Sequence, residues 1–297
     1  MTAERAADAV TVSRVLDELV RALSDRGMTE PMTEAREIIS ALLDVPRFWP
    51  IVNGGVELEA SLQERARAAA DRRARGAPLA YAVGRASFRH LTLDVDERVL
   101  IPRPETEQLV DLVLDETGLQ TGGIAIDIGT GSGAIAIALA AEGTFSRVYG
   151  TDVSRDAVDV ARHNASLCAP LLRSSVAFVH GSLLGPLADL RARVIVSNPP
   201  YIALGEAGAL PASVRDWEPS VALYGGLDGM ATTARLVREA AGALEPGGLL
   251  AVEIDARRAS LAADLVGRDP RFHRIRVELD LAGRERFVLA RRRHDSL

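Results

Sequence analysis

From residue 123 onward, short apolar runs alternate with amphipathic runs, and this alternation constrains the fold more than any other feature. Runs of helical periodicity separate runs of strand length, and strands that alternate with helices form mostly parallel sheets covered on both faces. We therefore predict an α/β fold with a doubly wound, mostly parallel, seven-stranded sheet. Its strands are expected at residues 124–129, 147–154, 176–181, 193–198 and 249–254, with a final antiparallel pair at 274–280 and 284–292. The helices between them are expected at residues 132–143, 155–166 and 231–248.

The first 77 residues show helical periodicity only. Helices are predicted at residues 11–23, 33–43 and 57–75, and these would form a small all-helical bundle. Residues 78–103 alternate between apolar and polar side chains and predict a β-hairpin linker. A helix then begins near Glu105 and opens the second domain. We thus expect three segments, 1–77, 78–103 and 104–297.

Composition favours a cytoplasmic protein. The chain of 297 residues is 47% hydrophobic, yet its most apolar stretches, such as residues 133–141 and 247–254, are far shorter than a membrane-spanning helix of roughly 20 residues. The first ten residues are polar and mixed in charge, unlike a secretion signal. Cys168 is the single cysteine, so neither an internal disulfide nor a zinc cluster of cysteines is expected, and no metal is predicted.

Charge is distributed unevenly along the chain. Residues 91–220 hold 9 arginines against 17 acids, a net charge of −8, within a total of −6. Proteins that bind nucleic acid normally carry an excess of basic residues. The distribution therefore disfavours direct nucleic-acid binding by the middle of the chain.

A glycine-rich loop, DIGTGSGA at residues 127–134, lies between a predicted strand and a predicted helix. Glycines allow a tight turn and close approach of a ligand. The spacing also satisfies the dinucleotide pattern GxGxx(G/A), so the loop alone is compatible with a nicotinamide site, an S-adenosylmethionine (SAM) site or a plain turn. Asp152 ends the next strand, where a carboxylate can accept hydrogen bonds from ribose hydroxyls. Asp127 favours SAM, because SAM has no pyrophosphate and a carboxylate there can interact with its methionine amino group.

The tetrapeptide Asn198-Pro199-Pro200-Tyr201 follows the fourth predicted strand. It suits methyl transfer to a planar amino nitrogen, whose lone pair is delocalised. The Asn198 side-chain oxygen and the Pro199 carbonyl can each accept one N–H hydrogen bond, which leaves the lone pair aimed at the methyl group. The prolines stiffen the loop, and Tyr201 can stack on the flat target group. No strong general base is required.

Together these motifs resemble the class I SAM-dependent methyltransferases that act on amino groups. More narrowly, they resemble the HemK/PrmC family, which methylates the glutamine amide of peptide chain release factors. The resemblance rests on residues 78–88, 95–110 (VDERVLIPRPETEQLV), 127–140, 198–201 and 214–230. It covers about residues 78–290, and the helical N-terminal domain fits the family in size and position.

The resemblance implies an enzyme that transfers a methyl group from SAM to the N5 atom of a release-factor glutamine. It implies that the helical domain reads the partner, and we expect a monomer. The implied catalytic residues are Asn198, Pro199 and Tyr201, and Pro200 would complete the glutamine site. The implied cofactor contacts are Thr106, Asp127, Gly129, Thr130, Gly131, Ser132, Gly133, Asp152, Ser182, Leu183 and Asn198.

Two positions depart from the family pattern. Ser182 stands where the family usually has an acid that accepts a hydrogen bond from the adenine amino group, and Asp255 replaces a glycine. Two other functions stay open at this point. One is methylation of an exocyclic amine of a nucleic acid, at adenine N6 or guanine N2, for which NPPY is equally suited. The other is a non-catalytic SAM-binding module, to which only the two departures point.

Several other residues have plainer interpretations. Arg103 and Glu105 can pair with each other and cap a helix. Trp217 and Tyr224 are expected in core or loop packing, and His163 has no evident partner.

Overall fold

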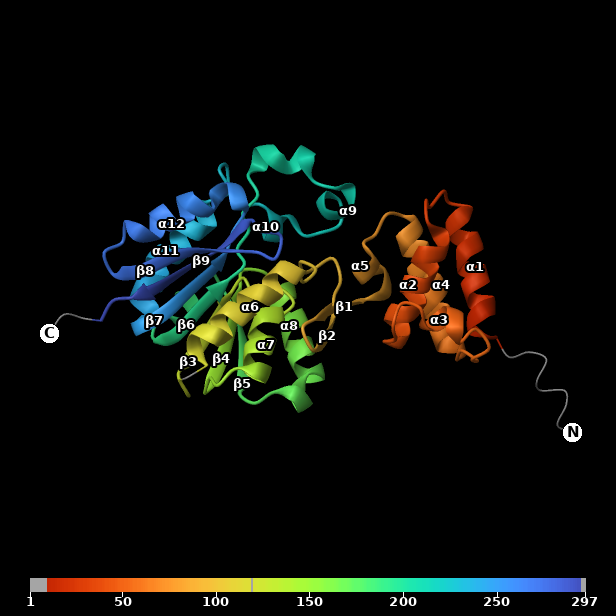
Figure 1. Ribbon diagram of the computed structural model, residues 1–297, viewed down its shortest axis with the longest axis horizontal. Coiled ribbons are helices and arrows are strands. Elements are labelled where there is room, and N and C mark those ends of the chain that lie inside the picture. The colour runs from red at the N-terminus through yellow and green to blue at the C-terminus, as the bar shows by residue number, and fades with distance from the viewer. Residues whose placement is uncertain (1–9, 119, 295–297) are drawn as a thin grey trace, which may run out of the picture. The chain divides into compact units, whose positions relative to one another are not determined.

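The computed structural model describes residues 10–118 and 120–294, which divide into two compact units (Figure 1). One unit comprises the chain up to Arg85 together with Pro211–Trp217. The other comprises Ala86–Leu210 and the chain from Glu218 onward.

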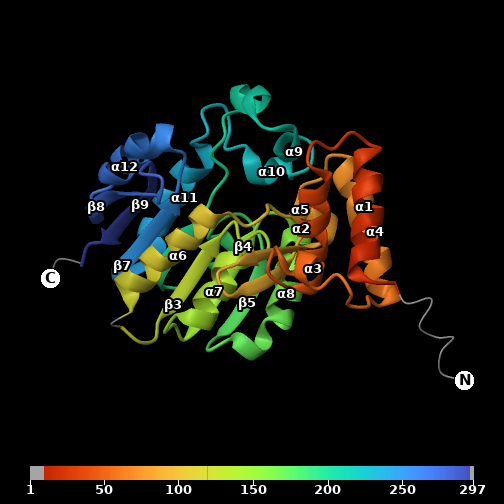
Figure 2. The same cartoon turned by 45° about the vertical axis from the view of Figure 1, so that its right-hand side comes forward.

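The first unit is helical, as the sequence predicts, and α1, α2 and α4 lie side by side in it (Figure 2). Its core is formed by apolar residues of α1, α2, α4 and α5. The second predicted helix begins two residues earlier than expected, at Pro31, because proline is favoured in the first helical turn. The short helices α3 and α5 were not predicted, since four or five residues carry too little periodicity. The helices of this unit are α1 Val12–Ser24, α2 Pro31–Leu43, α3 Trp49–Val52, α4 Ala60–Ala74, α5 Leu79–Val83 and α9 Ala212–Arg215.

The predicted hairpin region contains a separate two-stranded sheet, formed by β1 Arg85–Phe88 and β2 Leu91–Asp94. Helix α6, Pro104–Thr117, follows it and again begins at a proline.

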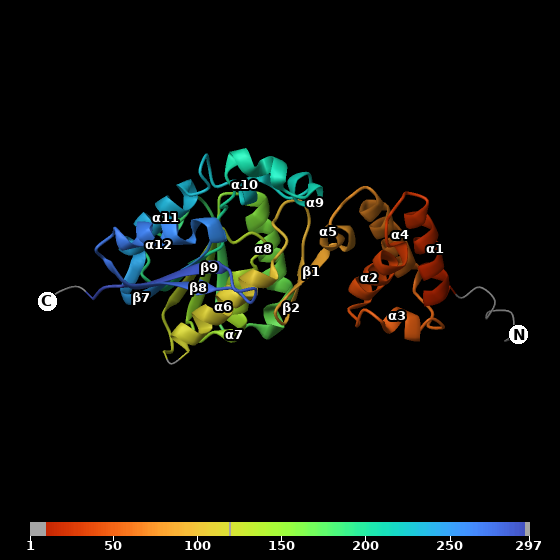
Figure 3. The ribbon, with the colours of Figure 1, turned by 45° about the horizontal axis from the view of Figure 1, so that its top comes forward.

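The second unit is built on a seven-stranded sheet, which confirms the predicted fold class. The strand order is β5-β4-β3-β6-β7-β9-β8. The first five strands in this order are parallel, whereas β9, which lies between β7 and β8, runs antiparallel to both of them (Figure 3). The strands are β3 Ile124–Ile128, β4 Arg147–Asp152, β5 Ser175–His180, β6 Ala192–Ser197, β7 Leu244–Glu253, β8 Phe272–Leu279 and β9 Glu285–Arg292.

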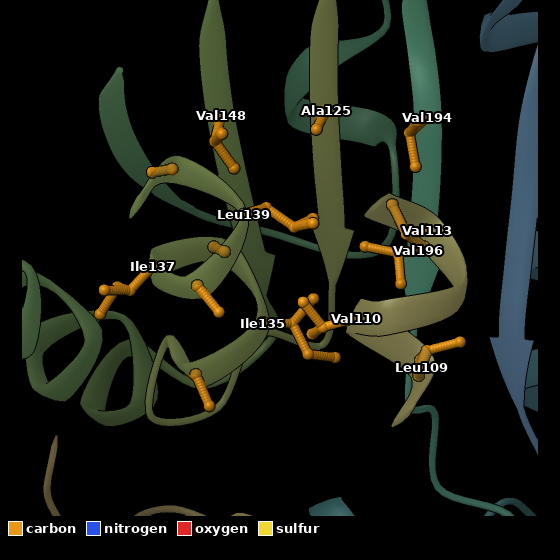
Figure 4. Packing of buried hydrophobic residues seen from close by; sticks show 14 of the residues in the cluster. Leu109, Val110, Val113, Ala125, Ile135, Ile137, Leu139, Val148, Val194 and Val196 are labelled. Carbon is orange, nitrogen blue, oxygen red and sulfur yellow. The ribbon is translucent and has the colours of Figure 1, made fainter. Parts of the chain in front are cut away.

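Helices cover both faces of this sheet because alternate strand residues point to opposite sides. Ala125, Val194 and Val196 belong to the core under α6, α7 and α8, as Figure 4 shows for α6 and α7. Their neighbours Ile126 and Ile195 belong to the core under α11 and α12. Each fully buried aliphatic side chain contributes about 1.5–3 kcal/mol. The helices of this unit are α6, α7 Ala134–Glu142, α8 Arg155–Leu167, α10 Ser220–Leu223, α11 Ala231–Ala243 and α12 Ala259–Gly267.

The predicted boundary between the helix at residues 231–248 and the strand at residues 249–254 is wrong. The helix expected over residues 231–248 ends at Ala243, and β7 begins at Leu244. Leu244 pairs with Ala192 of β6, and Leu249 pairs with Val194 after an irregularity. Residues 246–248 therefore form an irregularity within β7 rather than the end of a helix, and Gly247 adopts a φ of 79° that favours glycine.

Neither membrane nor metal features occur in the described part of the chain. No helix there is both long and apolar enough to cross a membrane. No three His, Cys, Asp or Glu side chains gather there in a way that could hold a metal ion.

Asn164 of α8 ties the two-stranded sheet to the glycine loop. Its side chain is fully buried, accepts a hydrogen bond from the Asp94 amide and donates to the carbonyls of Asp94 and Ser132. The adjacent His163, contrary to expectation, has a partner, since its Nε2 lies 2.8 Å from Asp94 Oδ2. Hence α8 holds two distant segments in place through one amide.

We predict that Asn164→Ala lowers the free energy of unfolding by about 2–3 kcal/mol, because it leaves buried backbone groups without partners. Chemical denaturation of the full chain measures this change. Ser166→Ala, on the exposed side of the same helix, is the matched control and should change stability by less than about 0.5 kcal/mol. Similar effects of the two substitutions would contradict the bridging role.

Candidate active site

The candidate site lies where the sheet order reverses. Strand β3 pairs with β4 on one side and β6 on the other, so a crevice opens beyond the carboxyl ends of β3 and β6. Ile128 pairs with Ser197, and the Ser197 hydroxyl donates to the Ile128 carbonyl at 2.7 Å. The residues that follow them, Gly129 and Asn198, therefore emerge side by side.

A cavity of about 290 Å³ occupies this crevice. The predicted site residues that line it are Gly129, Gly131, Asp152, Ser182, Leu183, Asn198, Pro199 and Pro200. Its other lining residues are Leu100, Ile128, Thr151, Val153, Gly181, Ser197, Val221, Ala222, Tyr224, Thr232 and Arg235.

The glycine loop owes its shape to left-handed glycines and a buried acid. Gly129 and Gly131 have φ values of 71° and 54°, and a Cβ added to either would meet no atom within 4 Å. Asp127, fully buried beneath the loop, accepts hydrogen bonds from the Thr130 hydroxyl and the Ala136 amide. Its Oδ1 has no partner among the described residues, and burial raises its pKa to about 7. The loop thus leaves open space above it and an unsatisfied acceptor below.

Asp152 fixes the other wall of the cavity. Its carboxylate accepts hydrogen bonds from the amides of Gly131 and Ser154. Burial raises its pKa, and the amide hydrogen bonds partly oppose this shift. The side chain lines the cavity, and the following Val153 lines it as well and is 57% exposed.

The NPPY segment presents two free acceptors. The Asn198 Nδ2 group donates to the Thr106 hydroxyl at 3.0 Å, and that hydroxyl donates to Glu253 Oε2 at 2.7 Å. Neither Asn198 Oδ1 nor the Pro199 carbonyl accepts a hydrogen bond from another described residue. Asn198 and Pro199 both line the cavity, so polar acceptors are available at the end of β6.

A second glycine segment packs against NPPY. Ile202 forms a bridge with Tyr224, which brings Gly225 and Gly229 against the NPPY backbone. A Cβ on Gly225 would lie 2.3 Å from the Pro200 carbonyl oxygen, and one on Gly229 would lie 2.3 Å from that of Tyr201. Only glycine allows this approach.

The two tyrosines have different places from those expected. Tyr201 is not among the cavity-lining residues; it packs beside the core under α11 and α12, and burial raises its pKa to about 12. Tyr224, which we expected only in packing, lines the cavity.

The far end of the cavity contains the first departure from the family pattern. The Ser182 hydroxyl accepts a hydrogen bond from Arg235 at 3.2 Å, and the Leu183 carbonyl accepts one from the Thr151 hydroxyl. Arg235 and Thr232 also line this end.

The second departure is not in the cavity. Asp255 has an ordinary φ of −64°, accepts a hydrogen bond from the Arg257 amide and pairs with the Arg257 side chain, so its backbone does not need glycine.

The chain matches two protein-family models. The methyltransferase small domain matches residues 105–210, and the PrmC N-terminal domain matches residues 14–84. Among curated relatives, the release factor glutamine methyltransferase of Moorella thermoacetica is 38% identical and covers 96% of this chain and 100% of its own length. Those of Deinococcus radiodurans and Mycobacterium leprae are 39% and 36% identical and cover 94% and 96% of this chain, and 97% and 98% of their own lengths.

The chain belongs to the release factor glutamine methyltransferase family. Solved structures agree at the level of the fold. A methyltransferase from Pyrococcus furiosus has a TM-score of 0.53 at 20% identity and covers 70% of this chain and 92% of its own. The catalytic domain of hMettl16 has a TM-score of 0.55 at 18% identity, covering 83% and 87%.

Methyltransferase domains use SAM as the methyl donor, and the residues in and around this cavity fit that cofactor. Open space lies above Gly129 and Gly131, the Asp152 carboxylate lines the cavity, and Asp127 has an unsatisfied oxygen. A positively charged, hydroxyl-bearing ligand matches this set of acceptors.

Six predicted site residues lie outside the cavity lining. Thr106 lies behind Asn198, Asp127 and Thr130 lie beneath the glycine loop, and Tyr201 packs aside. Ser132 offers its carbonyl to Asn164, and Gly133 precedes α7. Sequence reasoning missed Glu253, Val153, Thr232, Arg235, Gly225 and Gly229. The sequence points to Gly225 and Gly229 only through the family resemblance of segment 214–230. Glu253, the acid at the end of β7, lies in no local pattern that marks it as a site residue.

We predict that Gly229→Ala lowers kcat about tenfold or more, because the added Cβ collides with the Tyr201 carbonyl and the φ of 77° is strained for alanine. Methyl transfer under saturating substrates measures this. Gly205→Ala is the control, since its Cβ would meet no atom within 4 Å and its φ is not left-handed. An unchanged kcat in Gly229→Ala would mean that the loop can shift without moving NPPY.

The raised pKa of Asp127 predicts a pH-dependent stability. The ordinary value is 3.8, and the folded value is about 7. Between these values the folded state holds a proton that the unfolded state has lost, so ionisation of Asp127 increasingly opposes folding as pH rises. We expect Asp127 to lower the unfolding free energy by about 1.4 kcal/mol per pH unit between about pH 4 and 7.

Denaturant titrations of wild type and Asp127→Asn across this range measure the effect. The difference in unfolding free energy should change in favour of the variant as pH rises and level off above about pH 7. A difference that stays constant with pH would contradict the prediction.

Proposed function

We propose that this chain transfers a methyl group from SAM to the side-chain amide nitrogen, N5, of a glutamine in a peptide chain release factor. The observation that carries the proposal is the pair of free acceptors, Asn198 Oδ1 and the Pro199 carbonyl, at one end of a cavity whose other walls carry the glycine loop and Asp152. Membership of the family supplies the substrate class.

The residues of the chain perform this reaction mainly by positioning. A primary amide has two N–H groups and a delocalised lone pair, so it is a poor nucleophile. Asn198 Oδ1 and the Pro199 carbonyl accept one N–H each, which turns the nitrogen lone pair toward the cavity and stabilises positive charge as it develops. The prolines keep both acceptors rigid.

The cavity walls would hold the cofactor. Gly129 and Gly131 give room for the methionine part, Asp127 attracts its ammonium group, and Asp152 accepts hydrogen bonds from the ribose hydroxyls. At the far end, Ser182, Leu183 and Val153 would border the adenine. When bound, SAM supplies an electrophilic methyl group on a sulfonium centre.

The helical unit is proposed to recognise the release factor. It exposes large apolar side chains around α3, with Phe48 at 63%, Ile51 at 53% and Val52 at 80%. Exposed apolar groups of this kind are typical of protein interaction sites. We infer a protein partner without direct nucleic-acid binding, a monomeric enzyme, and action in the cytoplasm, where release factors work.

Radiolabel transfer from SAM to a purified release factor tests the proposal. One glutamine should be labelled, and its replacement by alanine in the release factor should abolish the label. A preparation that binds SAM but labels no release factor would contradict it. Label in RNA or DNA instead would favour an exocyclic amine as the acceptor.

We predict that Asn198→Ala lowers kcat by about two orders of magnitude, as expected for loss of a preorganised hydrogen-bonding group. Calorimetric titration with SAM should show a much smaller change in cofactor affinity, because Asn198 acts on the amide. Equal losses in turnover and in SAM affinity would instead mean that Asn198 mainly holds the cofactor.

A further inference from the structure

Glu253 is a buried acid beside the site, and it is neither a cavity-lining residue nor a contact of the proposed substrate or cofactor. It ends β7, is 1% exposed, and makes no ion pair with a described residue. Because Ser197 of β6 pairs with Val252 of β7, the next residues on the two strands, Asn198 and Glu253, come out at the same edge. Burial of a carboxylate costs several kcal/mol, so its position calls for a functional reason.

The Thr106 hydroxyl connects Glu253 to Asn198. Thr106, in the first turn of α6, is 5% exposed and donates to Glu253 Oε2 at 2.7 Å. The Thr106 hydroxyl oxygen in turn accepts a hydrogen bond from Asn198 Nδ2 at 3.0 Å. Three elements that are distant in sequence, α6, β6 and β7, thus meet in one chain of hydrogen bonds.

The donor and acceptor capacities of the three side chains decide which group donates in each of these hydrogen bonds. An ionised carboxylate only accepts hydrogen bonds, so the single hydroxyl proton of Thr106 is committed to Glu253. The Thr106 oxygen can then only accept from Asn198, which turns Nδ2 toward Thr106 and Oδ1 away from it. If the hydroxyl were free to rotate, it could donate to Oδ1, and the amide would present NH₂ where an acceptor is needed.

We infer that Glu253 and Thr106 are positioning residues that fix the orientation of the Asn198 amide, so that its oxygen faces the substrate amide. This inference rests on the proposed function and explains how the acceptor of the NPPY segment is kept in one orientation. Neither residue needs to touch the substrate for this role.

The surroundings of Glu253 allow its charge state to be tested. The charged or titratable groups that act on it are Arg286 of β9, Arg103 and Glu105 at the start of α6, and Tyr201 after β6. Arg103 is already paired with Glu218, and Glu105 with Arg284, rather than with each other as the sequence suggested. Burial raises the pKa of Glu253 to about 7. A protonated Glu253 can itself donate to Thr106, and the Thr106 hydroxyl is then no longer obliged to donate to Glu253.

The decisive variants are Thr106→Val and Thr106→Ser in the full chain. Valine keeps the shape but removes the hydroxyl, and serine keeps the hydroxyl. We expect kcat for release-factor methylation to fall on the order of tenfold or more in Thr106→Val, with SAM affinity within about threefold of wild type. Thr106→Ser should restore most of kcat. In an Asn198→Ala background, Thr106→Val should have little further effect.

Glu253→Gln supplies the second measurement, because glutamine has the same shape but no enforced direction. In wild type, kcat should rise with pH through about 7 as Glu253 ionises, and in Glu253→Gln this rise should be absent. A rise that persists unchanged in Glu253→Gln would overturn the inference. Should Glu253→Gln fail to fold, as judged by circular dichroism, the Thr106 pair decides alone.

Side-chain amide exchange reports on the same bond without any substrate. In ¹⁵N-labelled protein, the Asn198 NH₂ protons should exchange slowly in wild type and Thr106→Ser, and faster in Thr106→Val. An unchanged kcat and exchange rate in Thr106→Val would overturn the inference. Loss of SAM affinity in both Thr106 variants would overturn it too, and would make Thr106 a cofactor contact. Absence of methylation by wild type would count against the proposed function, while the exchange rates would still test the hydrogen bond.

Discussion

The parallel pairing of β3 with β6 is the constraint on which the site depends. It places Ile128 beside Ser197, and the buried hydrogen bond from the Ser197 hydroxyl to the Ile128 carbonyl reinforces the register. A slip of one residue would send every side chain of a strand to the other face. Both cores would then lose their apolar partners, so the packing that stabilises the sheet also keeps the glycine loop and NPPY at one edge.

Buried acids support both the glycine loop and the NPPY segment at the carboxyl ends of the strands. Asp127 holds the glycine loop from below, and Glu253 lies behind Asn198 through Thr106. Burial raises the pKa of each acid to about 7, and neither has an ion-pair partner among the described residues. Groups of this kind oppose folding when ionised, so their presence near the carboxyl ends of β3 and β7, the strands on either side of β6, is typical of a functional site rather than of a stabilising network.

The sequence predicts the features that depend on local pattern. Alternation of strands and helices predicts the sheet, and the strand-end positions of Gly129 and Asn198 predict that they meet. Contacts between distant segments are not encoded locally. Thr106 lies in segment 95–110, which resembles the family. Its hydrogen bond with Asn198 depends on where α6 packs, which the sequence does not specify. Val153 and Arg235 have no pattern that marks them as cavity-lining, and the end of α11 was misjudged because a Pro-Gly-Gly turn is compatible with either a helix end or an interrupted strand.

The two departures from the family pattern have different physical weight. Asp255 adopts an ordinary backbone conformation and caps the turn that follows β7, so the fold accommodates it without strain. Ser182 matters more, because it removes a charged acceptor from the far end of the cavity and its hydroxyl already accepts from Arg235. At that end Arg235 and the exposed Val153 line the cavity together with Ser182 and Leu183, where the proposed function puts the adenine. In that proposal Arg235 and Val153 would contact the ring through its faces rather than its edge, which needs neither a fixed acceptor nor a fixed proton. The two acceptors of the NPPY segment have no such freedom, since in the proposed function they must be matched to two N–H groups. At this end of the cavity the chain retains the full motif.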